Sequence, residues 1–236
     1  MINQDTQEAR DTNGLFSFKS AKYLWDQTLN LIFPPLCQHC GRVDTSFCDT
    51  CSQDLLSIPI ELITTELAPL QQIVSSGRHV GLLQAAVQSL KYNNQQQLGS
   101  TLALRLVNVL KRTNWQFDTI IPVPLHTQRL QKRGYNQAKE ISIHLAQLMA
   151  ITHHDDWLIR HSQTQSQVGL TRDERLENVK DAFTVTTDEL QGLKVLLLDD
   201  VRTTGATMAA CAEVLMQAGV QSVYGITITA AQDTNQ

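Results

Sequence analysis

Residues 195–207 read Val-Leu-Leu-Leu-Asp-Asp-Val-Arg-Thr-Thr-Gly-Ala-Thr, a short segment that joins an apolar run to a polar turn. Its apolar run, 195–198, is typical of a strand buried on both faces of a parallel sheet. The apolar pattern that follows, from Met208 to Gln217, predicts a helix ended by Gly219. Strand, turn and helix in this order form one unit of an open α/β sheet. Ligands of such sheets bind beyond the carboxyl ends of the strands, where the polar residues of this stretch fall.

Those polar residues combine two chemistries. Asp199 and Asp200 can accept hydrogen bonds from vicinal hydroxyls, such as the 2′ and 3′ hydroxyls of ribose. Small residues and hydroxyls then lead into the helix and can surround a phosphate at its N-terminus: Thr203, Thr204, Gly205, Ala206 and Thr207. Either half alone is common in structural turns and helix caps. Together they resemble the signature of the type I phosphoribosyltransferases, which implies a site for phosphoribosyl diphosphate (PRPP).

Elsewhere in the chain, apolar periodicity predicts further elements of the same sheet. Helices are expected at 82–90, 98–110 and 138–149, and strands at 119–123 and 223–229. Residues 161–180 are polar and weakly periodic, which predicts a mobile loop. We therefore predict an α/β domain over residues 61–236, an open parallel sheet flanked by helices. The resemblance implies that this sheet is type I phosphoribosyltransferase-like.

Two CxxC pairs, Cys37/Cys40 and Cys48/Cys51, are separated by seven residues. Each pair can form a knuckle with two thiolates, and two knuckles complete the tetrahedral coordination that zinc favours. Two disulfides are the alternative, but the polar start of the chain is no secretory signal, and a reducing compartment favours zinc. His39 is expected to be exposed rather than a ligand. Residues 1–60 are thus predicted to hold an amphipathic helix, over 15–33, and a small zinc-knuckle module.

The net charge of −4 hides an uneven distribution. Residues 71–180 carry 13 basic and 7 acidic side chains, a balance of +6, whereas 1–70 and 181–236 each carry −5. A basic middle points to an anionic partner, either a polyphosphate or a nucleic acid, although scattered solvated charge gives the same count. The sequence has no apolar run of about 18 residues, so no transmembrane segment is expected.

Several longer motifs accompany the cysteines and the turn. They are Phe-Pro-Pro-Leu-Cys-Gln-His-Cys-Gly (33–41), Leu-Lys-Tyr (90–92), Ile-Pro-Val-Pro-Leu-His (121–126), Arg-Leu-Gln-Lys-Arg-Gly-Tyr-Asn-Gln-Ala (129–138), Thr-x-x-Gln-x-x-Leu (164–170) and Arg-x-x-Asn-Val-x-x-Ala-Phe (175–183). On these segments most of the chain resembles the ComF family, which includes the competence proteins called ComFC and relatives called GntX. One departure is His79, where the family usually has an aromatic residue twelve positions before its lysine, here Lys91.

The resemblance implies roles for individual residues. The loop after the first sheet strand, 124–134, would bind the diphosphate of PRPP through Arg129 and Arg133, with Lys132 beside them. Lys91 would be a further phosphate contact. Each of these cations could instead simply face solvent.

The same resemblance implies a catalytic set and a metal. Asp199 and Asp200 would orient the ribose, and the loop at 161–180 would close over the site with Arg172 or Arg175 and exclude water. Magnesium would bridge the diphosphate and the ribose.

Two functions of different class remain open. The first is a magnesium-dependent enzyme that transfers phosphoribosyl from PRPP to an unknown acceptor, in nucleotide or small-metabolite metabolism. The second is a cytoplasmic binding protein of natural competence that handles incoming single-stranded DNA. Its partners would be competence and recombination proteins, which would also bring it to the inner membrane. PRPP could then be substrate or regulator.

Overall fold

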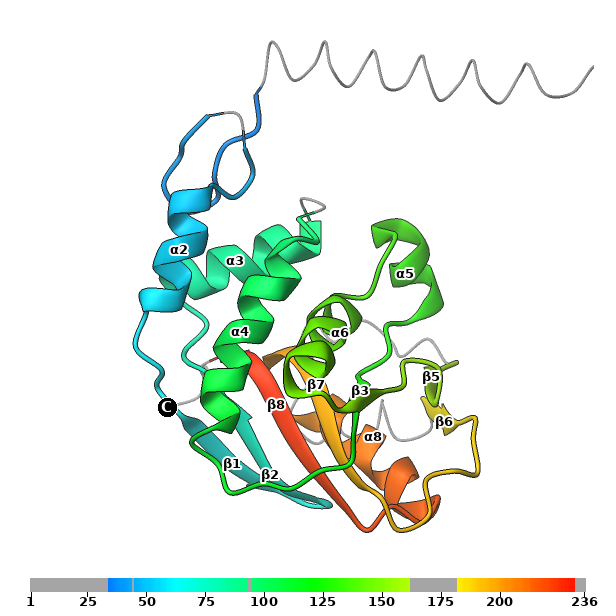
Figure 1. Ribbon diagram of the computed structural model, residues 1–236. Coiled ribbons are helices and arrows are strands. Elements are labelled where there is room, and N and C mark those ends of the chain that lie inside the picture. The colour runs from blue at the N-terminus through cyan, green and yellow to red at the C-terminus, as the bar shows by residue number, and fades with distance from the viewer. Residues whose placement is uncertain (1–33, 44, 93–94, 162–181, 232–236) are drawn as a thin grey trace, which may run out of the picture.

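The computed structural model describes residues 34–43, 45–92, 95–161 and 182–231. A six-stranded sheet lies at its centre, in the order β1-β2-β8-β7-β3-β4 (Figure 1). The strands are β1 (Ile63–Leu67), β2 (Leu70–Ser75), β3 (Thr119–Pro122), β4 (Thr152–His153), β7 (Lys194–Arg202) and β8 (Ser222–Ala230). Only β1 runs antiparallel to its neighbour among these strands; the other four pairings are parallel. A separate ribbon pairs β5 (Leu158–Arg160) with β6 (Phe183–Val185).

Helices cover both faces of the sheet. Helices α3 (Gly81–Tyr92), α4 (Leu98–Leu110) and α6 (Gln137–Met149) lie on one face, and α8 (Ala206–Gln217) lies on the other (Figure 1). The side chains of β7 alternate between the two cores: Leu196 and Leu198 pack with α4 and α6, and Val195 and Leu197 pack with α8. The prediction of a strand buried on both faces, in an open and mostly parallel sheet, is therefore confirmed.

The cysteine-rich segment adjoins the first core. Helix α2 (Asp49–Ser57) follows it, and Phe47 and Leu55 are buried in the same cluster as α3 and α4. Arg105 of α4, only 1% exposed, links this segment to the sheet. Its guanidinium donates to the carbonyl oxygens of Leu55, Ile58, Pro59 and Ser76 and to Ser76 Oγ, at 2.8–3.3 Å. Burial lowers the pKa of Arg105. The domain boundary at residue 60 stays a prediction.

The elements predicted from the sequence are largely confirmed, but α2, β4 and the β5–β6 ribbon were not predicted, and there are three further differences. Hydrogen bonding continues β7 to Arg202, beyond the predicted end at 198. The β1–β2 hairpin was not predicted. Residues 124–134, predicted as a loop, contain helix α5 (Thr127–Arg133), which buries none of its side chains and so shows no apolar periodicity. The side chain of His126 caps its start, and Gly134, at φ +87°, ends it. The predicted helix at 15–33 lies outside the described residues.

The strand order places a crevice between β3 and β7. From β3 the chain continues through α6 to β4 on one side, and from β7 it continues through α8 to β8 on the other. The loops after β3 and β7 therefore diverge, and the crevice beyond their carboxyl ends is where open α/β sheets bind ligands. Across the described residues, none of the helices is both apolar and long enough to span a bilayer.

Candidate functional site

The acid pair lies at the carboxyl end of β7, beside the crevice. Asp199 pairs with Thr227 of β8, so both acids lie among the last residues of the strand. From the sequence they are expected just beyond its end. Asp200 is 7% exposed, and its backbone N–H donates to Asp199 Oδ1 at 2.8 Å. Burial and the neighbouring Asp200 carboxylate raise the pKa of Asp199 to about 7, against the opposing charge of Lys91. The pair is thus poised to accept hydrogen bonds from hydroxyls and to exchange a proton near neutrality.

Lys91 joins the acid pair from the end of α3. Its Nζ lies 2.8 Å from Asp200 Oδ1, with both side chains mostly buried. His79 stands close by, with Nδ1 at 2.8 Å from Thr229 Oγ1 at the end of β8. Burial and then the charge of Lys91 lower the pKa of His79, which favours its neutral form. Sequence reasoning noted His79 only as a departure from a family pattern, yet it lies next to the predicted site.

The turn after β7 places a glycine at the start of α8. Gly205 has φ +85° and stands at the N-cap of α8, where it has no side chain to make a capping hydrogen bond. Thr204 Oγ1 accepts a hydrogen bond from Ala206 N at 3.3 Å, while Thr203 is exposed at the tip. A Cβ at Gly205 would come within 2.6 Å of Leu67 Cδ2. The turn therefore requires glycine and presents the N-terminus of α8 at the crevice.

The predicted cations gather across the crevice. A cavity of about 600 Å³, here called the cationic pocket, is lined by Lys91, Tyr92, Arg129, Lys132, Arg133 and Tyr135. Three of the cations lie on α5 at helical spacing, which places them on one face. Tyr135 is buried and donates from its hydroxyl to the carbonyl of Leu90, which fixes the end of α3 against the start of α6. Lys91 belongs both to this pocket and to the acid pair.

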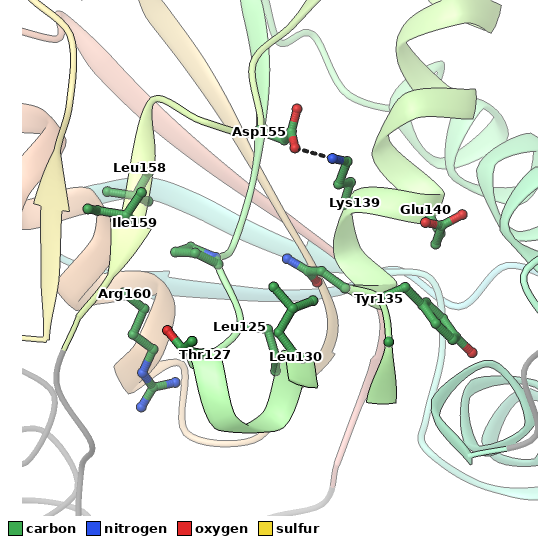
Figure 2. A pocket seen from close by; sticks show the side chains of 13 residues that line it. Leu125, Thr127, Leu130, Tyr135, Lys139, Glu140, Asp155, Leu158, Ile159 and Arg160 are labelled. Atoms are coloured by element: carbon green, nitrogen blue, oxygen red, sulfur yellow. Dashed lines mark ion pairs between the residues drawn. The ribbon is translucent and has the colours of Figure 1, made fainter. Parts of the chain in front are cut away.

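A second cavity, of about 500 Å³, is lined by Thr127 and Leu130 of α5 rather than by the cations of that helix (Figure 2). Leu125, Leu130, Leu158 and Ile159 form its apolar wall, and Lys139 and Asp155 form an ion pair at one end. Arg160 lies at the other end and packs over the ring of Phe183 at 5.3 Å. Burial and the charge of Arg129 lower the pKa of Arg160, against the charges of Cys211 and Asp199. Arg160 is thus a cation near the acid pair that sequence reasoning missed.

The remaining site predictions have different outcomes. Arg172 and Arg175, with the rest of the predicted loop after His161, lie outside the described residues. Cys211 is buried in α8. His153 belongs to β4 and shares a hydrogen bond with Ser142 Oγ at 2.8 Å.

The four N-terminal cysteines form a compact cluster. All four sulfur atoms lie within 4.8 Å of one another, with Cys37 Sγ 3.7 Å from Cys51 Sγ and Cys40 Sγ 3.6 Å from Cys48 Sγ. Four thiolates around zinc, at a zinc–sulfur distance of about 2.3 Å, have sulfur–sulfur separations of about 3.8 Å. All four are free thiols, so the structure does not contain the alternative of two disulfides. The cluster fits a tetrahedral metal such as zinc, and His39 is exposed beside it, as predicted.

The backbone around these cysteines favours their ionised, metal-binding form. The first pair surrounds a turn in which Gly41, at φ +73°, donates from its N–H to the carbonyl of Cys37. The second pair lies at the start of α2, where a helix N-terminus favours thiolate. Burial acts to raise the pKa of Cys37, but backbone donors outweigh it and bring the pKa to about 6. Burial and the adjacent sulfurs raise the pKa of Cys51, because four close thiols cannot all ionise without a compensating charge.

Comparison with known proteins places the chain in a family. No protein-family model matches it. Over 196 residues, however, it is 32% identical to competence protein F of Haemophilus influenzae, covering 80% of this chain and 82% of that protein. The chain belongs to the ComF family. DNA utilization protein YhgH of Salmonella typhimurium is 30% identical to this ComF-family chain over 195 residues, covering 80% and 86%. Competence protein ComFC of Bacillus subtilis is 31% identical over 100 residues, or 42% of this chain and 39% of that one.

Solved phosphoribosyltransferases are among its structural neighbours. Adenine phosphoribosyltransferase from Thermoanaerobacter pseudethanolicus has a TM-score of 0.39 and 14% identity, covering 76% of this ComF-family chain and 99% of that one. Glutamine PRPP amidotransferase from B. subtilis has a TM-score of 0.35 and 16% identity, covering 62% and 27%. The likeness is one of fold alone, and at these scores no conclusion about ligands follows from it.

Proposed function

We propose that this ComF-family protein binds PRPP in the crevice between β3 and β7 and acts in the use of DNA during natural competence. One observation carries the PRPP part. An acid pair, a glycine turn at a helix N-terminus and a cationic pocket meet where the strand order diverges, joined by the Lys91–Asp200 ion pair. A ligand with a diol between two phosphorylated ends matches these three features. The acid pair would bind the diol, and the glycine turn and the cationic pocket would each bind one phosphorylated end.

In this proposal each feature binds one part of PRPP. The turn from Thr203 to Thr207 binds the 5′-phosphate through backbone N–H groups and hydroxyls. Asp199 and Asp200 accept hydrogen bonds from the ribose hydroxyls. Arg129 and Arg133 neutralise the diphosphate, with Lys91 at its inner edge. The predicted contribution of Arg175 remains part of the proposal.

Two metals belong to the proposal. Zinc held by Cys37, Cys40, Cys48 and Cys51 would be structural, because the cluster is continuous with the core beside α3 and α4. Magnesium would accompany the diphosphate as its counter-ion, and the hard carboxylate oxygens of Asp199 and Asp200 suit it. When bound, it would lower the negative charge on the leaving diphosphate.

The role in DNA use rests on relatives. One is a competence protein and another is a DNA utilization protein, each covered over more than four-fifths of its length. We propose that single-stranded DNA is a direct ligand and that competence and recombination proteins are partners in the cytoplasm, at the inner membrane. The alternative is an enzyme that transfers phosphoribosyl to a small acceptor. The geometry is compatible with it, because electrostatic stabilisation of the leaving diphosphate needs no covalent nucleophile.

Ligand-induced thermal stabilisation tests the PRPP part. PRPP with magnesium should raise the melting temperature of the wild-type protein, as mass action requires for a ligand of the native state. The increase should be absent in Asp199→Asn/Asp200→Asn, and ribose 5-phosphate alone should give a smaller one. No stabilisation of the wild-type protein at millimolar PRPP would contradict the proposal. Release of diphosphate on addition of candidate acceptors would then favour the enzyme over a PRPP-binding regulator.

A further inference from the structure

Tyr92 is a large aromatic side chain left open to solvent at the mouth of the cationic pocket. Its exposed fraction of 73% is the highest among the exposed large hydrophobic residues of the described ranges. It occupies the last residue of α3, directly after Lys91. The guanidinium carbon of Arg133 lies 5.3 Å from the centre of its ring. A cation over the ring restrains the tyrosine while much of its surface stays accessible.

The surroundings of Tyr92 are strongly and uniformly positive. Of the six described residues that line the cationic pocket, four are cations, two are tyrosines and none is acidic. Lys91 is held by Asp200, but none of the salt bridges found among the described residues uses Arg129, Lys132 or Arg133. Arg129 and Lys132 are therefore available to an anion, whereas Arg133 donates to Gln137 Oε1 and lies over the ring of Tyr92. Arg129 and Lys132 are exposed on α5, which buries no side chain of its own.

An aromatic ring beside unpaired cations has a specific chemical complement. The ring stacks on a flat, unpaired base, and the cations bind the adjoining backbone phosphates. A duplex does not fit, because its base faces are already stacked and only its edges and phosphates are accessible. A free mononucleotide would use the ring and one cation, whereas a continuous strand can also reach the cations along α5.

We propose that Tyr92 is a base-stacking platform and that the cationic pocket binds single-stranded DNA. One base stacks on the ring surface that Arg133 leaves open, and flanking phosphates contact Arg129 and Lys132. Lys91 lines the same pocket and pairs with Asp200, and Arg129 is also assigned to the diphosphate, so the strand adjoins the proposed PRPP site and overlaps it at Arg129. This inference deepens the DNA role given under Proposed function and rests on it.

Fluorescence anisotropy with a labelled thymidine 20-mer tests the inference on the full-length protein. Tyr92→Ala should weaken binding by about 5- to 100-fold, the range for loss of one stacked base, and Tyr92→Phe should stay within about 3-fold of wild type. Arg129→Ala should reduce the dependence of affinity on salt by about one ion, and Lys111→Ala, an exposed cation of α4 outside the pocket, should not. All variants should keep the stabilisation by PRPP, except Arg129→Ala, which should lose part of it.

Three outcomes would overturn the inference, and they differ from one another. If the wild-type protein binds the 20-mer and Tyr92→Ala binds it equally well, the platform is wrong while the DNA role stands. If thymidine monophosphate displaces the 20-mer at equal concentration, the pocket is a mononucleotide site. If the wild-type protein binds no single strand at low salt, the DNA part of the proposed function fails together with the inference. Leu148→Ala, an exposed apolar residue on α6, controls for non-specific loss of surface.

Discussion

Lys91 Nζ lies 2.8 Å from Asp200 Oδ1, and this pair joins the end of α3 to the end of β7. Both side chains are mostly buried, so the pair is less screened than a surface salt bridge. Lys91 lowers the pKa of both neighbouring groups, Asp199 and His79. One cation therefore favours ionisation of Asp199, against burial and the Asp200 carboxylate, and also lines the cationic pocket.

Replacing Lys91 should affect both stability and ligand binding. Lys91→Met leaves the Asp200 carboxylate without its partner, which should destabilise the protein by about 1–3 kcal/mol. PRPP affinity should fall at least tenfold, because a phosphate contact is lost and Asp199 becomes harder to ionise. Chemical denaturation and calorimetric titration measure the two effects. Lys111→Met removes the same charge from an exposed position and should change neither. Equal PRPP affinity in Lys91→Met and wild type would contradict the assignment.

A side chain at Gly205 should distort the phosphate turn. Gly205→Ala combines a φ of +85° with a Cβ that would lie 2.6 Å from Leu67 Cδ2, so a loss of about 1–3 kcal/mol is expected. Stabilisation by PRPP should disappear, because the N–H groups of the turn move. Gly192→Ala is the matched control, with φ +77° but open space around the Cβ. It should cost some stability and leave the response to PRPP intact. A response retained in Gly205→Ala would argue against the turn as the phosphate site.

Proton release should accompany PRPP binding. With a pKa of about 7, Asp199 is mostly protonated at pH 6.5, and ribose hydroxyls that donate to it favour the ionised form. Calorimetry at pH 6.5 in buffers of different ionisation enthalpy should report up to about 0.7 proton released from this group. Asp199→Asn should remove that part of the signal, while protons from PRPP itself remain. If wild type and Asp199→Asn release the same number of protons, Asp199 does not change its protonation on PRPP binding.

The raised pKa of Asp199 also makes the free energy of unfolding depend on pH. In the unfolded chain the pKa of an aspartate is near 4. Between about pH 4 and pH 7, Asp199 is therefore protonated in the native protein and ionised in the unfolded chain. The contribution of Asp199 is therefore fully present below about pH 4 and is lost as pH rises through about 7. Denaturation of wild type and Asp199→Asn across this range should show a difference that grows with pH in favour of the variant. A difference that shrinks with rising pH would mean that Asp199 is ionised throughout.

Loss of one thiol should release the metal of the cysteine cluster. Cys48→Ser and Cys51→Ser should abolish the one zinc per chain expected from elemental analysis and lower the melting temperature, because buried residues of the cluster belong to the core. Cys211→Ala is the control, since this buried cysteine lies on α8 and not in the cluster. Purified wild-type protein without stoichiometric metal, and with the four cluster thiols reactive, would contradict a metal-binding role.

Arg105 should be among the most sensitive positions of the fold outside the site. Arg105→Met leaves the carbonyls of Leu55, Ile58 and Ser76 without a donor, so a loss of about 3 kcal/mol or more is expected. Arg112→Met is the control, because that exposed side chain makes one hydrogen bond, to the carbonyl of Ile60. It should change the free energy of unfolding by less than about 0.5 kcal/mol. If Arg105→Met lowered the free energy of unfolding no more than Arg112→Met, the buried hydrogen bonds of Arg105 would contribute little to stability.

The sequence predicted those parts of the fold that have a strong apolar pattern. Helix α4 begins and ends where the periodicity does, and the turn at 199–207 was found because strand, acids, glycine and helix adjoin in the chain. Helix α5 was missed, because a helix that buries nothing has no apolar face to detect. Arg105 carried a readable signal, since it falls on the apolar face of α4 between Leu102 and Val109.

The parts of the site that depend on tertiary contacts could not be predicted. The sequence shows Lys91 and Asp200 as separate candidates 109 positions apart, and only the meeting of α3 with β7 makes them a pair. Arg160 lies on the short β5–β6 ribbon, and its electrostatic interaction with Asp199 depends on where that ribbon lies in the fold. Tyr92 reads as one aromatic residue of a family motif, and its exposure beside Arg133 appears only in the structure.

A crystal structure of the full-length protein with PRPP and magnesium would show whether PRPP binds in the crevice between β3 and β7. The expected result has the 5′-phosphate on the backbone N–H groups of residues 203–207, the ribose hydroxyls on Asp199 and Asp200, and the diphosphate facing Arg129 and Arg133. Density for PRPP elsewhere, such as the cavity beside Arg160 and Lys139, would contradict the claim, as would an empty crevice at saturating ligand.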